Sequence, residues 1–406
     1  MRRIDPHSFV RATRLTTRHI NRQIVLNLVR EHQPISRADL ARKMRLARGR
    51  MTQIVSELIA EGEIFVGPTM QTPRGRRPEL LHVRTRDRLV MAVDIRLSRT
   101  FLMLGDFAGA PLILESFETV RDPARLMSEV AKCVRAILKK HDRAKRCEGI
   151  GLVIPGMVDQ STGTVLNSPQ LGWKNVDVRD SLARSTGLPV QIENAPIACA
   201  LARMWLGEHG VAVPQNFVYV TVSDGVGAGV VVNGELVRGH SHTAGEFGHL
   251  PIDLEGPICL CGARGCLEAY TSNIATLSRY LGVEFSARSA HDLVRSSGLT
   301  VSDVVERAAR GERRAIRTLQ ETGRYLGAGL AAIINALNPG VVFVGGEVTE
   351  AWDILQPVIR AAISDRALTP GAAVTPLVIE PADAYPRLRG ATALVAARAF
   401  AAPKIA

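Results

Sequence analysis

The sequence predicts an α/β protein with an N-terminal winged helix-turn-helix and a two-lobed body that carries a zinc loop. Three observations support this fold class. Positive charge is concentrated in residues 1–88, the pattern changes to strands and glycine turns from Leu89, and the segment 245–268 places one His and three Cys at metal-ligand spacing. A chain of 406 residues is too long for one hydrophobic core and predicts two or three domains.

Net charge divides the chain into two unequal parts. Residues 1–88 contain 19 Lys and Arg against 8 Asp and Glu, whereas the remaining residues contain 32 against 31. A basic module joined to a nearly neutral body predicts that the module binds a polyanion and that the body binds something else.

The apolar segments indicate a cytoplasmic protein without a membrane span. The N-terminus lacks the apolar core of a signal peptide. The longest apolar stretch, 326–346, is interrupted by Asn335, Asn338, Pro339 and Gly340. We therefore expect a buried helix, a turn and a strand there.

Three helices are expected in the basic module. Apolar residues at helical spacing mark the first over Arg18–His32. The second begins at Ser36, with Asp39 as its capping-box partner, and the third spans about 47–61. This order is typical of a helix-turn-helix.

A two-stranded wing is expected after the third helix. The strands 64–66 and 80–83 can pair around the Arg-rich loop 73–78. In a winged helix-turn-helix the third helix enters the major groove, and the wing reaches phosphates or the minor groove. The residues expected to contact operator DNA are Arg48, Arg50 and Gln53 on the helix and Arg74, Arg76 and Arg77 in the wing. The alternative is a solvated basic face on a module that only packs.

The body shows a weak internal duplication. One hairpin is expected over 89–106 and a second over 217–236, with a further strand and turn at 149–156. This duplication predicts two α/β lobes with a cleft between them. The expected domains are the DNA-binding head 1–88, the first lobe 89–205 and the second lobe 206–384, with a helix in 385–406 returning to the first lobe.

The cysteine-rich segment predicts a structural Zn²⁺ site. The expected ligands are His249, Cys259, Cys261 and Cys266. Three thiolates and one imidazole leave no open position for water, as in closed structural sites. The metal would then fix two neighbouring carboxylates, Glu246 and Glu268. The alternative is a group of reduced thiols without a metal, and the other cysteines, 133, 147 and 199, are expected to be buried.

Several motifs together resemble one family. They are the zinc segment from Gly245 to Glu268, the turn Ile154–Asp159, the stretch Ile192–Asn194, the loop Asp224–Gly229 and Val344–Gly346. Over nearly its whole length the chain resembles the ROK family (repressors, open reading frames and sugar kinases), and specifically its winged-helix repressors of the N-acetylglucosamine, glucose or xylose type. The resemblance implies an actin-like, hexokinase-like body, a zinc ion and a sugar in the cleft.

The resemblance also implies which residues hold the sugar. They are Asn194, Glu246, His249 and Glu268. Carboxylates and an amide suit a ring of vicinal hydroxyls, because carboxylates accept hydrogen bonds and an amide both donates and accepts. His249 can ligate zinc through one ring nitrogen and face the sugar through the other. The alternative is that Glu246 and Glu268 only support the zinc ligands or cap helices.

Departures from the kinase pattern predict a protein that does not phosphorylate sugar and does not need ATP. Where the kinases have a catalytic Asp after Glu-Asn, this chain has Ala195, and a methyl group cannot act as a general base. The phosphate loop is replaced by Asp94–Ser98, which contains no glycine, and Asp224 stands in the second loop. Arg96 could instead offer a cation to a phosphorylated sugar.

The expected function is therefore a sugar-responsive transcriptional regulator. A repressor is favoured, and the sequence leaves the sign of regulation open. Its partners would be operator DNA and a small carbohydrate or sugar-phosphate effector, and it would act as a homodimer or a dimer of dimers. One alternative is an ATP-dependent sugar kinase with an added DNA-binding head. Another is a regulator controlled by a protein partner, with a vestigial cleft.

Overall fold

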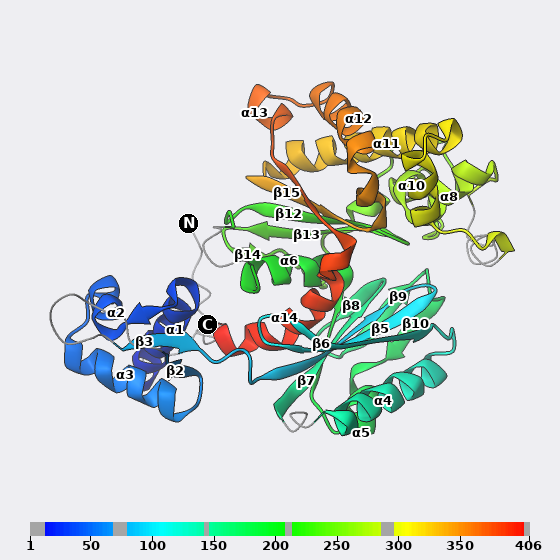
Figure 1. The fold of residues 1–406 in the computed structure, drawn as a ribbon. Coiled ribbons are helices and arrows are strands. Elements are labelled where there is room, and N and C mark those ends of the chain that lie inside the picture. The colour runs from blue at the N-terminus through cyan, green and yellow to red at the C-terminus, as the bar shows by residue number, and fades with distance from the viewer. Residues whose placement is uncertain (1–12, 68–78, 142–145, 208–212, 286–295, 402–406) are drawn as a thin grey trace.

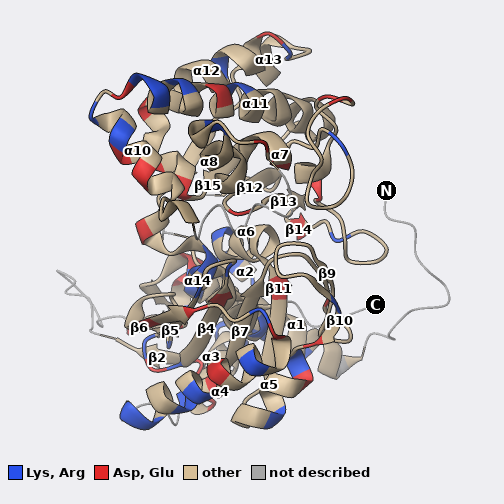
Figure 2. Ribbon diagram, turned by 90° about the vertical axis from the view of Figure 1, so that its right-hand side faces the viewer, with Lys and Arg blue, Asp and Glu red and all other residues tan. Residues whose placement is uncertain are grey.

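The structure is a computed structural model that describes residues 13–67, 79–141, 146–207, 213–285 and 296–401. The chain forms a small N-terminal head beside two larger α/β lobes (Figure 1). Charged residues lie mainly on the helices and loops, and the strands are mostly uncharged (Figure 2), as expected for sheets that are covered by helices. In the part of the chain that is described, no helix is both long enough and apolar enough to cross a bilayer.

The head consists of three helices and one small sheet. The helices are α1 (Arg14–His32), α2 (Arg37–Met44) and α3 (Arg48–Ala60), and the strands are β1 (Ile35–Ser36), β2 (Ile64–Val66) and β3 (Leu80–Val83), in the order β1-β3-β2. The structure contains the helices and the strand pair expected here, and β1 is additional. Helix α1 begins before the expected Arg18 because Thr13 caps it, accepting a hydrogen bond of 3.2 Å from the Thr16 amide.

The first lobe is built on a five-stranded mixed sheet. Its order is β11 (Val190–Asn194), β7 (Cys147–Ile154), β4 (Leu89–Ile95), β5 (Arg99–Asp106) and β6 (Pro111–Glu118). Strands β4, β5 and β6 are antiparallel, and β7 is parallel to β4 and β11. Helices α4 (Pro123–Lys140) and α5 (Arg179–Thr186) pack on one face. A small sheet of β8 (Met157–Asp159), β9 (Thr164–Ser168) and β10 (Trp173–Asp177) completes the lobe.

The second lobe repeats this topology. Its sheet has the order β14 (Glu235–Leu236), β13 (Val226–Val232), β12 (Phe217–Val222), β15 (Val341–Gly345) and β16 (Leu377–Glu380). Again three antiparallel strands are followed by two parallel ones. The outer helices are α7 (Glu268–Thr271), α8 (Asn273–Leu281), α10 (Val301–Ala309), α11 (Arg313–Leu337), α12 (Trp352–Ser364) and α13 (Pro370–Ala373). The helix, turn and strand expected over 326–346 are the end of α11, a left-handed Asn338 and β15.

Two helices lie between the sheets of the two lobes. Helix α14 (Pro386–Phe400) packs on β4 and β7, α6 (Ala195–Trp205) packs on β12 and β13, and the two helices pack on each other. Glycines allow these close approaches. A Cβ atom at Gly151 of β7 would lie 1.8 Å from the Ala391 carbonyl oxygen, and one at Gly229 of β13 would lie 2.3 Å from that of Pro196.

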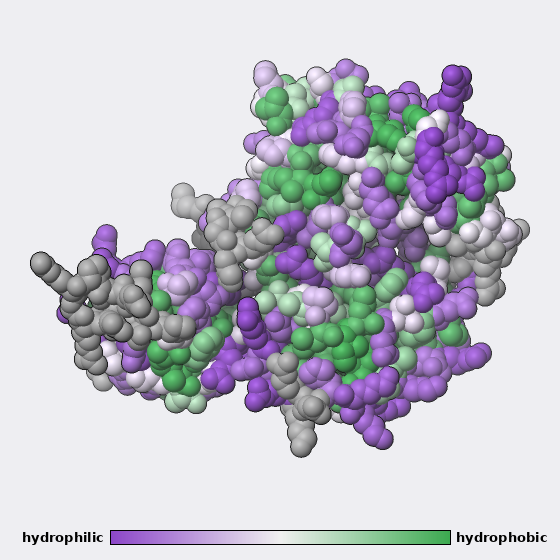
Figure 3. Space-filling model, viewed as in Figure 1, coloured by the Kyte–Doolittle hydropathy of each residue, from purple (hydrophilic) through white to green (hydrophobic). Residues whose placement is uncertain are grey.

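An apolar patch is exposed on the first lobe. Apolar residues gather on the first lobe around β6 in the view of Figure 3, where Leu112 and Leu114 of this edge strand are exposed.

Cys199 is buried as predicted, but Cys133 and Cys147 are only half-buried, because they lie near the outer face of α4 and at the first residue of β7. The prediction was wrong for these two.

Candidate functional site

A cavity of about 780 Å³, its open mouth included, lies between the two lobes. Its first-lobe wall follows β4, β7 and β11, where their carboxyl ends meet at one edge of the sheet, as is usual for ligand sites in α/β proteins. The second lobe contributes the turn between β12 and β13 and the Cys-rich loop. The polar lining residues are Arg96, Asn167, Gln170, Asn194, Thr221, Ser223, Asp224, Glu246, His249, Glu268 and Arg387.

All four residues expected to hold a sugar line this cavity. Asn194 ends β11, and its side-chain oxygen caps α6 by accepting a hydrogen bond of 3.2 Å from the Ile197 amide. Glu268 is 2% exposed, and its Oε2 accepts a hydrogen bond of 2.9 Å from the Val226 amide. Glu246 lies across from His249, with 3.7 Å between Glu246 Oε2 and His249 Nε2. Four side chains from β11, a 3-10 turn and α7 thus face one space.

Burial makes the two carboxyl groups weaker acids. It raises the pKa of Glu268 to about 7 and also raises the pKa of Glu246, because a charged carboxylate is poorly solvated there. Such groups accept hydrogen bonds from ligand hydroxyls in either protonation state.

The expected zinc ligands form one cluster. The ligand atoms of His249, Cys259, Cys261 and Cys266 all lie within 4.8 Å of one another. Cys259 Sγ is 3.7 Å from His249 Nδ1, and Cys261 Sγ is 3.8 Å from Cys266 Sγ. A tetrahedral zinc with Zn–S bonds of ~2.3 Å would place two sulfur atoms ~3.8 Å apart, so the donor set fits this metal.

The loop that carries these ligands depends on glycine. Gly265 has a φ of +65°, and a Cβ atom there would lie 1.5 Å from the Asp253 carbonyl oxygen. Next to this turn, the backbone of Cys266 forms an isolated antiparallel β-bridge with that of Pro251. His249 directs Nδ1 toward the cysteines and Nε2 toward Glu246, so its two nitrogens face different partners.

Ala195 and part of a charged network also line the cavity. Ala195 begins α6 and lines the cavity. Arg96 donates a hydrogen bond of 2.7 Å to Asp94 and one of 2.5 Å to Glu347 of η3 (Glu347–Ala351). Arg387 of α14 is 2.7 Å from Asp94.

Sequence reasoning missed two members of this network. Glu347 directly follows the Val344–Gly346 motif, which is a weak signal that it lies near the cavity. Arg387 has no such signal, because its position depends on the return of α14 to the first lobe.

The residues expected to contact DNA are only partly described. Arg48, Arg50 and Gln53 are exposed on α3, and Arg50 and Gln53 border a hollow shared with Arg18 of α1. Arg74, Arg76 and Arg77 lie outside the described residues.

The head contacts the body through α1 and the ends of α6 and α14. Arg30 donates a hydrogen bond of 2.8 Å to the Trp205 carbonyl oxygen. Asn27 donates one of 2.8 Å to the Phe400 carbonyl oxygen, and Gln23 one of 2.7 Å to that of Ala399. These contacts connect both cavity helices to the head.

Comparisons with known proteins agree with this architecture. The profile of the ROK family matches residues 91–398. The xylose repressor of Caldicellulosiruptor bescii is 29% identical over 86% of this chain and 88% of its own length. The crystal structure of a ROK family transcriptional regulator, homologous to the E. coli MLC protein, matches with a TM-score of 0.74 and 28% identity over 95% of this chain and 97% of its own. A ROK family glucokinase from Streptomyces griseus, solved with glucose and AMPPNP, matches with a TM-score of 0.65 and 25% identity over 76% of this chain and 99% of its own.

Proposed function

The chain belongs to the ROK family, and from this premise we propose that it is a sugar-responsive, DNA-binding transcriptional repressor that binds its effector without phosphorylating it. The share of the chain that is matched supports a regulator over a kinase, since the regulator structure covers 95% of this chain and the glucokinase covers 76%. The domain assignment that goes with this proposal is a head of 1–88, a first lobe of 89–205 with the C-terminal helix, and a second lobe of 206–384.

The observation that carries the proposal is the path from the cavity to the head. Helix α6 begins at Ala195 in the cavity wall and ends at Trp205 against Arg30. Helix α14 carries Arg387 in its first turn and ends at Phe400 against Asn27. A sugar that changes the angle between the lobes would therefore move two helices that contact the head directly.

In this function each element has a role. The head binds operator DNA as a winged helix-turn-helix, through Arg48, Arg50 and Gln53 at base edges and through the wing arginines at the backbone. A sugar is held by Asn194, Glu246, His249 and Glu268. A homodimer or dimer of dimers presents two heads to two half-sites, and the effector changes their spacing so that they no longer fit.

Zinc would have a structural role here. His249, Cys259, Cys261 and Cys266 would hold it, and the metal would supply a rigid cross-link in the loop that aims Glu246 and His249 at the cavity. Ala195 supports a binding protein over an enzyme, because the cavity residue at the kinase base position carries no acid.

Two assays test the proposal together. Operator sequences are first selected from a random DNA pool, and binding is then measured by fluorescence anisotropy with and without xylose, glucose and N-acetylglucosamine. We expect at least one sugar to weaken DNA binding, with no ATP consumed in a coupled kinase assay. Sugar-dependent ATP turnover would instead identify a kinase with a DNA-binding head. Sugar binding without any effect on DNA binding would favour control by a protein partner.

A further inference from the structure

The charged network beside the cavity has at least as many carboxyl groups as guanidinium groups. Two guanidinium groups, Arg96 and Arg387, face the carboxylates of Asp94 and Glu347, and Asp224 adds a third carboxyl group. Asp94 is fully buried and contacts both arginines. The cavity therefore has no surplus positive charge around Arg96 and Arg387.

The Arg96 guanidinium is held from three sides. Its Nε and Nη1 atoms bond different carboxylates, Asp94 at 2.7 Å and Glu347 at 2.5 Å, and its plane lies over the Phe101 ring, 4.8 Å from the centroid. Nε belongs to one donor edge of the guanidinium and Nη1 to the other, so each edge that could offer paired N–H groups to a phosphate already has one nitrogen bonded to a carboxylate.

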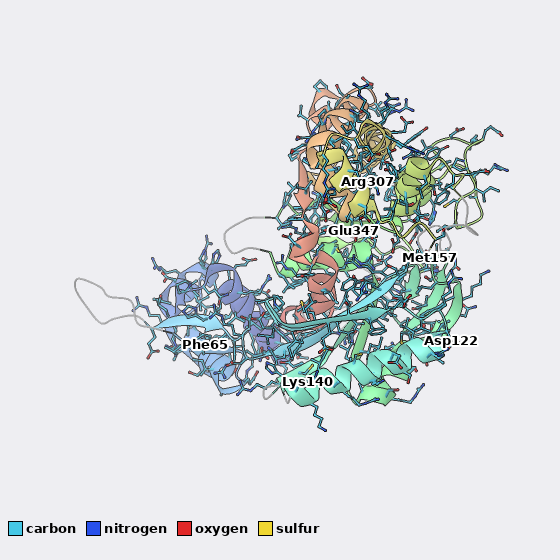
Figure 4. The ribbon with its side chains drawn as sticks, turned by 45° about the vertical axis from the view of Figure 1, so that its right-hand side comes forward. Phe65, Asp122, Lys140, Met157, Arg307 and Glu347 are labelled. Carbon is cyan, nitrogen blue, oxygen red and sulfur yellow. The ribbon has the colours of Figure 1, made fainter. Side chains whose placement is uncertain are left out.

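Glu347 is itself positioned to keep this contact. It belongs to the second lobe, near the junction between the lobes (Figure 4), and its Oε2 accepts a hydrogen bond of 3.0 Å from Asn273. Besides the bond from Arg96 to Glu347, a second hydrogen bond connects the lobes: the Leu97 amide donates to Asp224 Oδ2 at 3.3 Å. These two bonds hold the first lobe to the second.

A phosphorylated ligand would meet this network unfavourably. A bidentate contact with Arg96 would require it to displace Asp94 or Glu347 and leave a largely buried carboxylate without its cation. Apart from Arg96 and Arg387, the charged side chains of the lining are Asp224, Glu246 and Glu268, whose carboxyl groups repel a phosphate when they are ionised. A zinc ion with three thiolates and a neutral imidazole would carry a net charge of −1, so the metal site would supply no positive charge either.

We propose that Glu347, by holding Arg96, makes the cavity select unphosphorylated sugars over sugar phosphates. The inference rests on the proposed function, because it names the chemical class of the effector. Hydroxyl groups of a neutral sugar can donate to the carboxylates that line the cavity, and they add no negative charge beside the carboxylates of the network.

The test is isothermal titration calorimetry on the full zinc-loaded chain with three pairs of ligands. The pairs are glucose and glucose 6-phosphate, N-acetylglucosamine and its 6-phosphate, and xylose and xylose 5-phosphate. For the pair that binds, we expect the neutral sugar to bind about tenfold or more tightly than its phosphate. Glu347→Gln should release Arg96 and reduce that preference, and adding Arg96→Gln should abolish the gain in phosphate affinity.

A matched control is Glu350→Gln, three residues away on the same 3-10 turn. Glu350 is exposed, so the substitution changes the net charge equally without touching Arg96. It should leave the preference as in the wild type. A phosphate that binds as tightly as the neutral sugar, or equal effects of the 347 and 350 substitutions, would overturn the inference while the proposed function stands. Failure of all six ligands to bind would overturn the proposed function and the inference with it.

Discussion

Arg30 of α1 donates a hydrogen bond of 2.8 Å to the carbonyl oxygen of Trp205, the last residue of α6, and its guanidinium lies over the Trp205 ring at 4.8 Å from the centroid. The same guanidinium lies 5.5 Å from the Phe400 ring at the end of α14. One side chain of the head therefore touches the ends of both helices that begin in the cavity wall.

The first prediction is that the double substitution Arg30→Ala with Asn27→Ala weakens the coupling between DNA binding and the sugar. Coupling between two sites is typically about 1–3 kcal/mol, and it should fall because two of the three hydrogen bonds described from α1 to the ends of α6 and α14 are gone, leaving that of Gln23 to Ala399. Sugar affinity, measured by calorimetry, and operator affinity without sugar, measured by anisotropy, should change little.

The control for this prediction is Arg22→Ala. Arg22 lies on the same helix but pairs with Glu61 of the head, so its loss removes an ion pair within the head. It should keep the wild-type sugar response. An unchanged response in the double variant would mean that the signal does not pass through these helix ends.

The second prediction is that the purified protein contains one zinc per chain. Cys266→Ser should lose the metal, because Cys266 is a buried member of the ligand cluster, and should lower the stability of the body by more than about 2 kcal/mol. Inductively coupled plasma mass spectrometry measures the zinc content, and thermal unfolding measures the stability of the body. DNA binding by the head should survive in part.

Cys133→Ser is the matched control, since Cys133 lies on α4 and outside the cluster. It should retain zinc. Protein prepared without chelators that contains no metal would contradict the assignment.

Local patterns in the sequence predicted the elements of this fold well. Apolar runs broken by short turns predicted the β4–β5 and β12–β13 hairpins, and ligand spacing predicted the cluster around His249. These features depend on residues that are close in the sequence, where periodicity and turn residues are informative. The convergence of Asn194 with Glu268 came from the family resemblance, not from any local pattern.

Long-range pairings could not be predicted in this way. Arg96 and Glu347 are 251 residues apart, and nothing in either local pattern specifies the other as a partner. For that reason Arg96 was a candidate for binding a phosphate, whereas the structure engages it with two carboxylates. The contact of Arg30 with Trp205 is likewise set only when the lobes and head have assembled.

The third prediction separates base contacts from backbone contacts in the head. Arg50→Ala should relax operator specificity and cost about 1–3 kcal/mol, because an exposed α3 arginine can make a bidentate contact with guanine. Arg76→Ala should weaken all sequences evenly and flatten the dependence of binding on salt. Anisotropy on matched and mismatched operators at several salt concentrations measures both, and small equal effects would show that helix and wing are wrongly assigned.

The last prediction concerns the packing of α14 on α6. Alanine in place of glycine within a helix usually stabilises a protein by about 1 kcal/mol. At Gly390 the sign should reverse, because a Cβ atom there would lie 2.7 Å from the carbonyl carbon of Ala198 and 2.9 Å from its oxygen. Gly390→Ala must push the two helices apart, at a cost of about 1–3 kcal/mol in the free energy of unfolding.

Urea denaturation, followed by near-UV circular dichroism of the body's tryptophans, measures this cost against Gly371→Ala. Gly371 lies in α13, and the nearest heavy atom to an added Cβ would be 4.0 Å away, so that variant should be unchanged or slightly more stable. Because α6 and α14 also contact the head, Gly390→Ala should alter the sugar response while Gly371→Ala does not. Equal stability of the two variants would show that the helices can separate freely, and such helices could not transmit movement from the cavity to α1.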